Sequence, residues 1–155
     1  QGPALVLGAG GAARAVCVGL LDAGTPAIYL ANRTGERAEE VKAHIGDAIT
    51  VIPWESRNRM MPEAHLVVNT TTLGMKGFPE LEITLDGLPK TALVTDIVYH
   101  PLETALLAQA RLKGYKVVDG LGMLLHQAAP GFERWFGTKP EVTPALRAHV
   151  PLHEL

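Results

Sequence analysis

The first segment with a chemical signature is a glycine-rich turn between a short apolar run and a helical stretch. Residues 8–13 read Gly-Ala-Gly-Gly-Ala-Ala and fit the G-x-G-x-x-A spacing of dinucleotide-binding turns. Gly8 permits a tight turn, Gly10 lets the backbone approach a pyrophosphate, and Ala13 allows the helix to pack closely on the strand. The free N–H groups and the positive dipole end of the helix favour phosphate. This context favours a dinucleotide site over the alternative, a structural turn that happens to be rich in glycine.

The segment after the next apolar run indicates which dinucleotide would bind. An NAD enzyme holds the adenosine ribose with an acidic residue about 20 positions after the glycine turn. This chain has Ala31-Asn32-Arg33-Thr34 at that place, with Arg37 one turn later and no carboxylate at the position. An arginine binds a 2′-phosphate through paired hydrogen bonds, and asparagine and threonine add neutral ones. Most arginines are solvated surface charges, but the placement of these two beside the expected ribose pocket favours NADP.

Short apolar runs alternate with helical stretches along the chain, as in βαβ units around a parallel sheet. We predict an α/β fold of the Rossmann type, with a doubly wound, mainly parallel, six-stranded sheet and helices on both faces. The expected strands are 4–7, 27–31, 49–52, 66–69, 92–98 and 115–118. The expected helices are 11–23, 34–45, 103–113, 121–136 and 143–149.

Some segments depart from this regular pattern. Residues 70–90 form a long predicted loop, and residues 60–64 are assigned to no element. Pro130 should kink or break the long helix near the C-terminus, because proline removes a backbone donor and clashes with the preceding turn. The first apolar run follows Gln1 almost at once and no methionine precedes it. We therefore expect a fragment or a separately produced domain.

The bulk composition limits the classes of function. The chain has 155 residues, a hydrophobic content of 47% and a net charge of −2. We expect one globular domain over residues 1–155 that binds neither nucleic acid nor a membrane, because no basic patch is evident and no apolar run approaches about 20 residues. The single cysteine, Cys17, excludes an internal disulfide and fits a cytoplasmic location. The six histidines lack metal-ligand spacing, so we predict no metal.

Several further segments resemble the shikimate dehydrogenase family. Residues 69–75 read Asn-Thr-Thr-Thr-Leu-Gly-Met and resemble its N-x-T-x-x-G-M segment. Residues 96–104 resemble its D-x-x-Y-x-P-x-x-T motif, and residues 119–128 resemble its G-x-G-M-L-x-x-Q-A helix start. The glycine turn and the Asn32-Arg33-Thr34 segment agree in order and spacing. The resemblance therefore covers essentially the whole chain.

This resemblance implies the cofactor domain of a two-domain enzyme that reversibly reduces 3-dehydroshikimate to shikimate with NADPH. In that family an N-terminal domain binds most of the substrate and carries a catalytic lysine–aspartate pair. No residue of this chain matches that pair, so we assign no catalytic residue here and expect the N-terminal domain to lie outside the chain. The C-terminal helical segment, about 121–155, would pack back towards that domain. The chain or its parent enzyme is also expected as a possible homodimer.

The resemblance also implies a role for each candidate site residue. The expected contacts to the pyrophosphate are Gly8, Ala9, Gly10, Gly11 and Ala12, and those to the ribose phosphate are Asn32, Arg33, Thr34 and Arg37. The residues expected to border the rest of the cofactor are Thr70, Thr71, Ile97 and Gly120. The expected substrate contacts are Tyr99 and Gln127. The alternative to a substrate contact is a structural role in a turn for Tyr99 and a position on a helix surface for Gln127.

Other functions stay open from the sequence. A quinate or shikimate enzyme that uses NAD predicts an acidic residue where Asn32-Arg33 stands. Glutamyl-tRNA reductase shares a similar glycine turn and Asn-Arg-Thr segment but lacks the motifs at 96–104 and 119–128. A non-catalytic NADP-binding module would lack a catalytic domain altogether.

Overall fold

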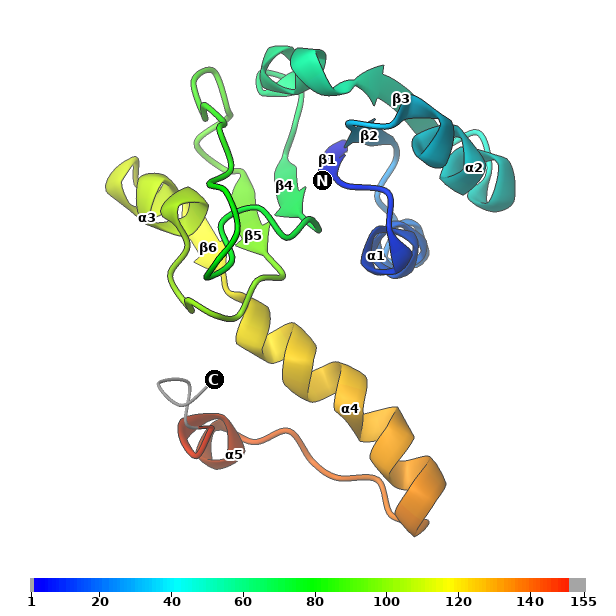
Figure 1. The fold of residues 1–155 in the computed structure, drawn as a ribbon, viewed down its shortest axis with the longest axis vertical. Helices are drawn as coiled ribbons and strands as arrows, with labels where there is room; N and C mark the ends of the chain where they lie inside the picture. The colour runs from blue at the N-terminus through cyan, green and yellow to red at the C-terminus, as the bar shows by residue number, and fades with distance from the viewer. Residues whose placement is uncertain (1, 151–155) are drawn as a thin grey trace.

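The strands of this protein form one parallel sheet in the order β3-β2-β1-β4-β5-β6 (Figure 1). The structure is a computed structural model that describes residues 2–150. The predicted Rossmann-type fold is confirmed, while the last five residues of the predicted 121–155 segment lie outside the described residues. The strands are β1 (Ala4–Leu7), β2 (Ile28–Asn32), β3 (Ile49–Pro53), β4 (Leu66–Asn69), β5 (Leu93–Asp96) and β6 (Lys116–Val118). The helices are α1 (Gly11–Asp22), α2 (Gly35–Ile45), η1 (Trp54–Met60, a 3₁₀ helix), α3 (Ala105–Leu112), α4 (Gly120–Phe136) and α5 (Pro144–Ala148).

Each face of the sheet carries its own apolar core. Successive side chains of a strand point to opposite faces, and every residue of β1 is buried. Ala4 and Val6 pack with α1 and α2 on one face, whereas Leu5 and Leu7 pack with α3 on the other. A strand buried on both sides reads as a continuous apolar run, which is why ALVL carries no polar alternation. Helices therefore cover both faces, as predicted.

Two of the five crossovers between the described strands lack an α-helix. The 3₁₀ helix η1 joins β3 towards β4, and residues 70–92 join β4 to β5 without helix or strand. The predicted loop at 70–90 is thus confirmed. Leu81, Leu85 and Leu88 anchor this loop, because all three are buried in the core beside α3. Hydrophobic burial there replaces the packing that a crossover helix would supply.

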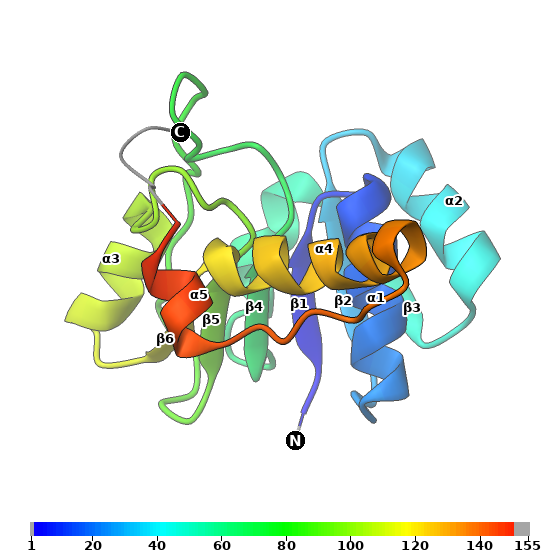
Figure 2. The same ribbon diagram turned by 90° about the horizontal axis from the view of Figure 1, so that it is seen from below.

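The long helix α4 continues through Pro130, so a break there is wrong, while the alternative of a kink stays a prediction. Proline at this position removes the hydrogen bond to the carbonyl of His126. Both residues are exposed, so water can satisfy that carbonyl and the helix continues. Figure 2 shows α4 crossing the molecule with α5 beside it. Arg147 of α5 bonds Asp119, the N-cap of α4, at 2.6 Å.

The strand register brings the ends of four strands to one edge of the sheet. Leu7 lies opposite Ala31 of β2 and Asn69 of β4, and Asn69 lies opposite Asp96 of β5. The residues that follow these positions must therefore emerge side by side. In open α/β sheets ligands bind outside this carboxyl edge.

Gly120 occupies a position in the fold that a larger residue cannot share. A Cβ atom there would lie 2.4 Å from the carbonyl oxygens of both Ile97 and Val98. We expect Gly120→Ala to lower the free energy of unfolding by about 1–3 kcal/mol, because backbone atoms must move to admit the methyl group. Urea unfolding followed by circular dichroism measures the change.

Gly122 provides the matched control two residues further along α4, because a Cβ on it would meet no atom of another segment within 4 Å. Gly122→Ala should leave stability unchanged or raise it by about 0.5–1 kcal/mol through the helix preference of alanine. Equal effects of the two substitutions would show that the close contact at Gly120 does not constrain the fold.

Candidate cofactor site

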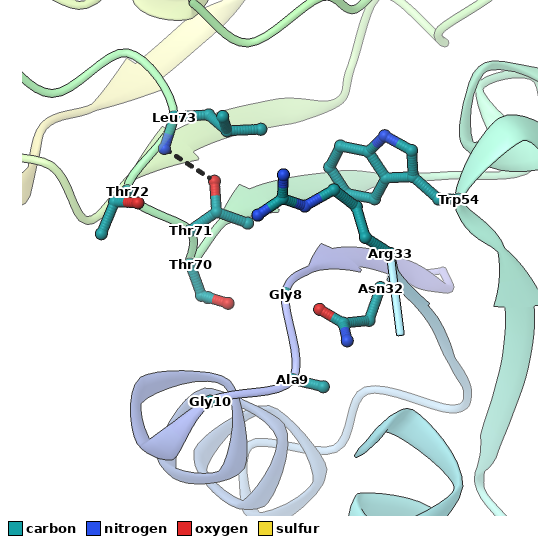
Figure 3. Close-up of a pocket in the computed structure, with 10 residues that line it drawn as sticks. All are labelled: Gly8, Ala9, Gly10, Asn32, Arg33, Trp54, Thr70, Thr71, Thr72 and Leu73. Carbon is teal, nitrogen blue, oxygen red and sulfur yellow. Dashed lines mark hydrogen bonds between the residues drawn. The ribbon is translucent and has the colours of Figure 1, made fainter. Parts of the chain in front are cut away.

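A pocket opens at the carboxyl edge of the sheet, where β1, β2, β3 and β4 end (Figure 3). The loops after β1, β2 and β4 each contribute to its wall. The predicted residues that the structure brings together there are Gly8, Ala9, Gly10, Asn32, Arg33, Thr70 and Thr71. The lining residues that the sequence did not predict are Trp54, Thr72 and Leu73.

The glycines of the turn have two different roles, and that of Gly8 is structural. Gly8 has a φ of +104°, and a Cβ on it would lie 2.8 Å from Oγ1 of Thr70. Thr70 is held there because its hydroxyl donates to the carbonyl of Leu7 at 2.6 Å. Gly8 is therefore required by the fold itself.

Gly10 instead leaves room for a ligand. It is the N-cap of α1, and a Cβ on Gly10 or Gly11 would have no neighbour within 4 Å. The N–H groups in the first turn of a helix lack intrahelical acceptors, and no side-chain cap bonds them here. A helix start with open space in front of it binds anions readily. The turn therefore fits the pyrophosphate of a dinucleotide, with Gly11 and Ala12 supplying backbone of the first turn.

The end of β2 supplies the polar and cationic part of the pocket. The Nδ2 atom of Asn32 donates to the carbonyl of Thr34 at 2.7 Å, which fixes the turn into α2. Arg33 is exposed, lines the pocket and reaches towards Thr71 in Figure 3. Thr34 is the N-cap of α2, and Arg37 lies exposed on the first turns of that helix. Neither Thr34 nor Arg37 is among the residues that line the pocket.

A buried hydrogen-bond network shapes the wall formed by residues 70–73. Asn69 donates through Nδ2 to Oδ1 of Asp96 at 3.0 Å and to the carbonyl of Leu73 at 3.1 Å. Its Oδ1 accepts from the backbone N–H of Thr71 at 3.0 Å and from the Thr71 hydroxyl at 2.7 Å. The Thr71 hydroxyl in turn accepts from the N–H of Leu73 at 3.1 Å. The loop beside the glycine turn is thus held by one asparagine side chain.

Asp96 completes the network from β5 and is 1% exposed. Its Oδ1 accepts from the N–H of Val98 at 3.0 Å, and its Oδ2 accepts from the hydroxyl of Thr104 at 2.8 Å. Burial raises the pKa of the Asp96 carboxyl above its ordinary value, while these hydrogen bonds and that of Asn69 oppose the rise. Asn69, Asp96 and Thr104 therefore bond one another and the nearby backbone rather than a ligand. Thr71 both takes part in this network and lines the pocket.

The candidates for the nicotinamide and substrate end lie apart from this pocket. Ile97 and Gly120 meet at the close backbone contact described above. Tyr99 lines a second pocket with Met75, Lys76 and His100. Gln127 is exposed on α4 and is not among the residues that line that pocket.

The sequence carried a usable signal for one residue that it did not predict. Trp54 follows directly after β3, so it emerges at the same edge of the sheet as the Asn32–Arg33 segment. An aromatic residue just past a predicted strand end is a candidate for a pocket wall. Thr72 and Leu73 carried no comparable signal, because their place depends on the loop conformation.

Among residues 2–150 no group of three or more His, Cys, Asp or Glu side chains is arranged to hold a metal ion, and no helix is long and apolar enough to span a membrane.

Comparisons with known proteins agree with this geometry. The model of the shikimate/quinate 5-dehydrogenase family matches residues 1–77, and that of the shikimate 5′-dehydrogenase C-terminal domain matches residues 120–148. The NADP(+) shikimate dehydrogenase of Roseobacter denitrificans is 58% identical over 150 residues, which cover 97% of this chain and 54% of the relative. The chain belongs to the shikimate dehydrogenase family.

Solved structures of the family share the fold. A shikimate 5-dehydrogenase from Thermus thermophilus, in complex with NADP(H) and shikimate, has a TM-score of 0.77 at 38% identity and covers 91% of this chain and 51% of its own. A quinate dehydrogenase from Corynebacterium glutamicum, in complex with NAD, has a TM-score of 0.85 at 30% identity and covers 95% and 54%. The chain thus spans about half the length of the shikimate dehydrogenases that it matches.

The buried carboxyl of this family member predicts a measurable pH dependence. Because the pKa of Asp96 is raised on folding, the folded protein binds that proton more tightly than the unfolded chain. The resulting stability is present below the unfolded pKa of about 4 and is lost as the pH rises through the folded pKa. The free energy of unfolding of the wild type should therefore decline relative to that of Asp96→Asn, which cannot titrate, as the pH rises above about 4.

Urea unfolding of both proteins at several pH values measures this difference directly. Asp86→Asn is a suitable control, because Lys113 lowers the pKa of that exposed carboxyl and the sign of the effect is opposite. A difference between wild type and Asp96→Asn that does not change with pH would contradict the raised pKa.

Proposed function

We propose that residues 1–155 form the NADP-binding domain of a shikimate dehydrogenase, which interconverts shikimate and 3-dehydroshikimate. The observation that carries the proposal is the pocket in which the glycine turn faces Asn32 and Arg33, with no carboxylate at the end of β2. The names of the matched relatives, shikimate dehydrogenase (NADP(+)), support this cofactor and substrate.

Different residues in and beside the pocket bind different groups of NADP. The N–H groups at the start of α1 bind the pyrophosphate, over the open space at Gly10. Arg33 binds the 2′-phosphate as a charged partner, and Asn32 holds the turn that presents it. Thr34 and Arg37 stand further out and add to the positive end of α2 and to the local charge. Thr70 and Thr71 form the wall towards the nicotinamide half.

The bound cofactor supplies the hydride acceptor or donor of the reaction. We place its nicotinamide end near Ile97 and Gly120, where the absence of a side chain on Gly120 keeps the backbone of the two segments in contact. Tyr99 and Gln127 are the proposed substrate contacts, since a phenol and an amide bind hydroxyl groups without adding charge. They stand on separate elements, the loop after β5 and helix α4.

The proposal places the catalytic acid–base pair in a further domain outside these 155 residues. The chain spans about half the length of its matched relatives. Helix α4 supports the proposal, because it exposes 43% of Phe132, 79% of Trp135 and 66% of Phe136. Such a cluster of exposed aromatic side chains is typical of a contact surface. We infer that the additional domain covers it; a homodimer and a cytoplasmic location stay predictions.

A quinate dehydrogenase that uses NAD is the alternative that the fold alone leaves open. The similarity to such an enzyme from Corynebacterium glutamicum concerns the backbone, which NAD and NADP enzymes of this family share. The side chains at the end of β2 favour NADP. An acidic residue would bind the ribose hydroxyls of NAD, whereas an arginine suits the 2′-phosphate of NADP.

The first test measures cofactor preference. We expect the 155-residue chain to bind NADP(H) at least tenfold more tightly than NAD(H), because a hydrogen bond to a charged group contributes about 1.5–3 kcal/mol. Arg33→Ala should reduce NADP affinity towards that of NAD and leave NAD affinity nearly unchanged. Isothermal titration calorimetry gives both constants, and equal affinities in the wild type would reject the assignment of NADP.

Gly10→Val is the control for the position of the cofactor. Its side chain points into open space, so the fold tolerates it, but it occupies the place of the pyrophosphate. Binding of both cofactors should be lost while the circular dichroism spectrum stays native. A Gly10→Val variant that binds NADPH normally would show that the cofactor lies elsewhere.

The second test concerns turnover. We expect the 155-residue chain to bind NADPH without oxidising shikimate, because hydride transfer needs both substrates held in close contact and a proton-transfer group within hydrogen-bond reach. Absorbance of NADPH follows the reaction with shikimate and NADP. Steady turnover by the purified chain alone would show that the catalytic group lies among these residues.

In the longer enzyme, Tyr99→Phe and Gln127→Ala should raise KM for shikimate more than KM for NADP. Gln109→Ala serves as a comparison on α3, because Gln109 contributes to neither proposed site. Equal effects on both KM values would argue against substrate contacts.

A further inference from the structure

Trp54 lines the pocket, and the proposed function gives it no role. The register of β2 and β3 places Asn32 opposite Pro53, so Trp54 begins η1 directly beside the Asn32–Arg33 segment. It lines the pocket together with the glycine turn. It also lines the adjoining hollow, which Asn32 and Arg33 share.

The indole of Trp54 is held in place. The guanidinium carbon of Arg57 lies 4.4 Å from the centroid of the ring. Arg57 donates to the carbonyl of Trp54 at 2.7 Å and to the carbonyl of Glu82 at 2.6 Å. These two bonds fix the cation, and the cation–π contact fixes the ring. Arg57 contacts one face of the ring and is not among the residues that line either hollow.

The order of groups along the sheet edge indicates what would meet this ring. The proposed function places the pyrophosphate at the end of β1 and the 2′-phosphate at the end of β2. The base is attached to the same ribose as the 2′-phosphate, so it must lie close to Arg33. Beyond β2 in the sheet comes β3, and Trp54 is the residue that follows it.

We propose that Trp54 is the adenine-binding residue of this site and that its indole stacks on the purine of NADP. This inference rests on the proposed function. Every base presents a flat aromatic face, so stacking on a fixed indole adds affinity without reading the 2′-phosphate. Trp54 would therefore bind the adenosine half in general, while Arg33 would select for the phosphate.

The alternative is that Trp54 serves packing alone, since it also contacts the core beneath η1. Fluorescence separates the two roles without changing Trp54. The chain has two tryptophans, and Trp135 is exposed on α4. Trp135→Phe leaves Trp54 as the only indole. Adenosine 2′,5′-bisphosphate should quench its emission to saturation, whereas nicotinamide mononucleotide should not. Saturable binding of the bisphosphate by calorimetry with no change in emission would overturn the proposal.

Substitution of Trp54 gives the second measurement. Stacking of one base on an aromatic side chain corresponds to roughly a tenfold change in affinity. Trp54→Leu should weaken NADP and NAD binding by the same factor of roughly ten, so their ratio stays at the wild-type value, and Trp54→Phe should recover most of the loss. Arg33→Ala should instead change the ratio. Native affinities in a folded Trp54→Leu protein, or a loss that affects nicotinamide mononucleotide equally, would overturn the role of Trp54.

The two hypotheses fail in different ways. If wild-type protein does not bind NADPH in calorimetry, the proposed function fails and the stacking inference falls with it. If NADPH binds with the expected preference but neither the emission nor the Trp54→Leu affinity responds as stated, the proposed function stands and only the inference about Trp54 is rejected.

Discussion

The hydrogen bond between Asn69 and Asp96 is the interaction on which the form of the binding edge depends. It joins the last residues of β4 and β5, two neighbouring strands, inside the protein where water cannot compete. The other hydrogen bonds of the Asn69 and Asp96 side chains go to residues in the segments that follow β4 and β5. The carboxyl therefore tolerates burial, at the cost of a raised pKa. This pair thus connects the loop at 70–73 with the segment after β5.

The network matters more here because the crossover from β4 to β5 has no helix. A helix satisfies its own backbone groups and presents a ready apolar stripe, whereas residues 70–92 must obtain both from elsewhere. Polar order comes from Asn69 at the start of the loop, and apolar order comes from Leu81, Leu85 and Leu88. Residues 70–73 of this loop therefore form a pocket wall, whereas its later residues pack in the core. This arrangement explains how a segment without regular structure can border a binding site.

The fold was largely predictable because its signals are local. Buried parallel strands are apolar runs, glycines such as Gly24 and Gly46 follow the first two helices, and the glycine turn marks the first crossover. The continuity of α4 through Pro130 was not predictable from local rules, because it depends on whether the carbonyl of His126 reaches water. The 3₁₀ helix η1 was also missed, since a short helix of this kind has no apolar period to detect.

The site was predictable to a different degree in its two halves. The glycine turn and Asn32–Arg33 follow from motif spacing, and the pocket brings them together. The motifs that contain the candidates Thr70, Thr71 and Tyr99 also contain Asn69, Asp96 and Thr104, whose hydrogen bonds turn inward. A motif thus records both ligand contacts and the residues that position them, and only the partners of each side chain separate the two. Trp54 lies outside every motif, because its contribution depends on which strand stands next to β2.

The order of the strands also determines how cofactor choice can change without a change in fold. Pyrophosphate, ribose and base would meet three adjacent strand ends, each with its own loop. A substitution at the end of β2 alters the charge offered to the ribose but leaves the hydrogen bonds of β1 and the packing of η1 in place, because the side chain of Arg33 takes part in neither core. Under the proposed function, affinity for the shared parts of NAD and NADP and selection between them would therefore be separable properties of this edge. Such a separation would fit the similarity of the backbone between this chain and two proteins whose structures hold NAD or NADP(H).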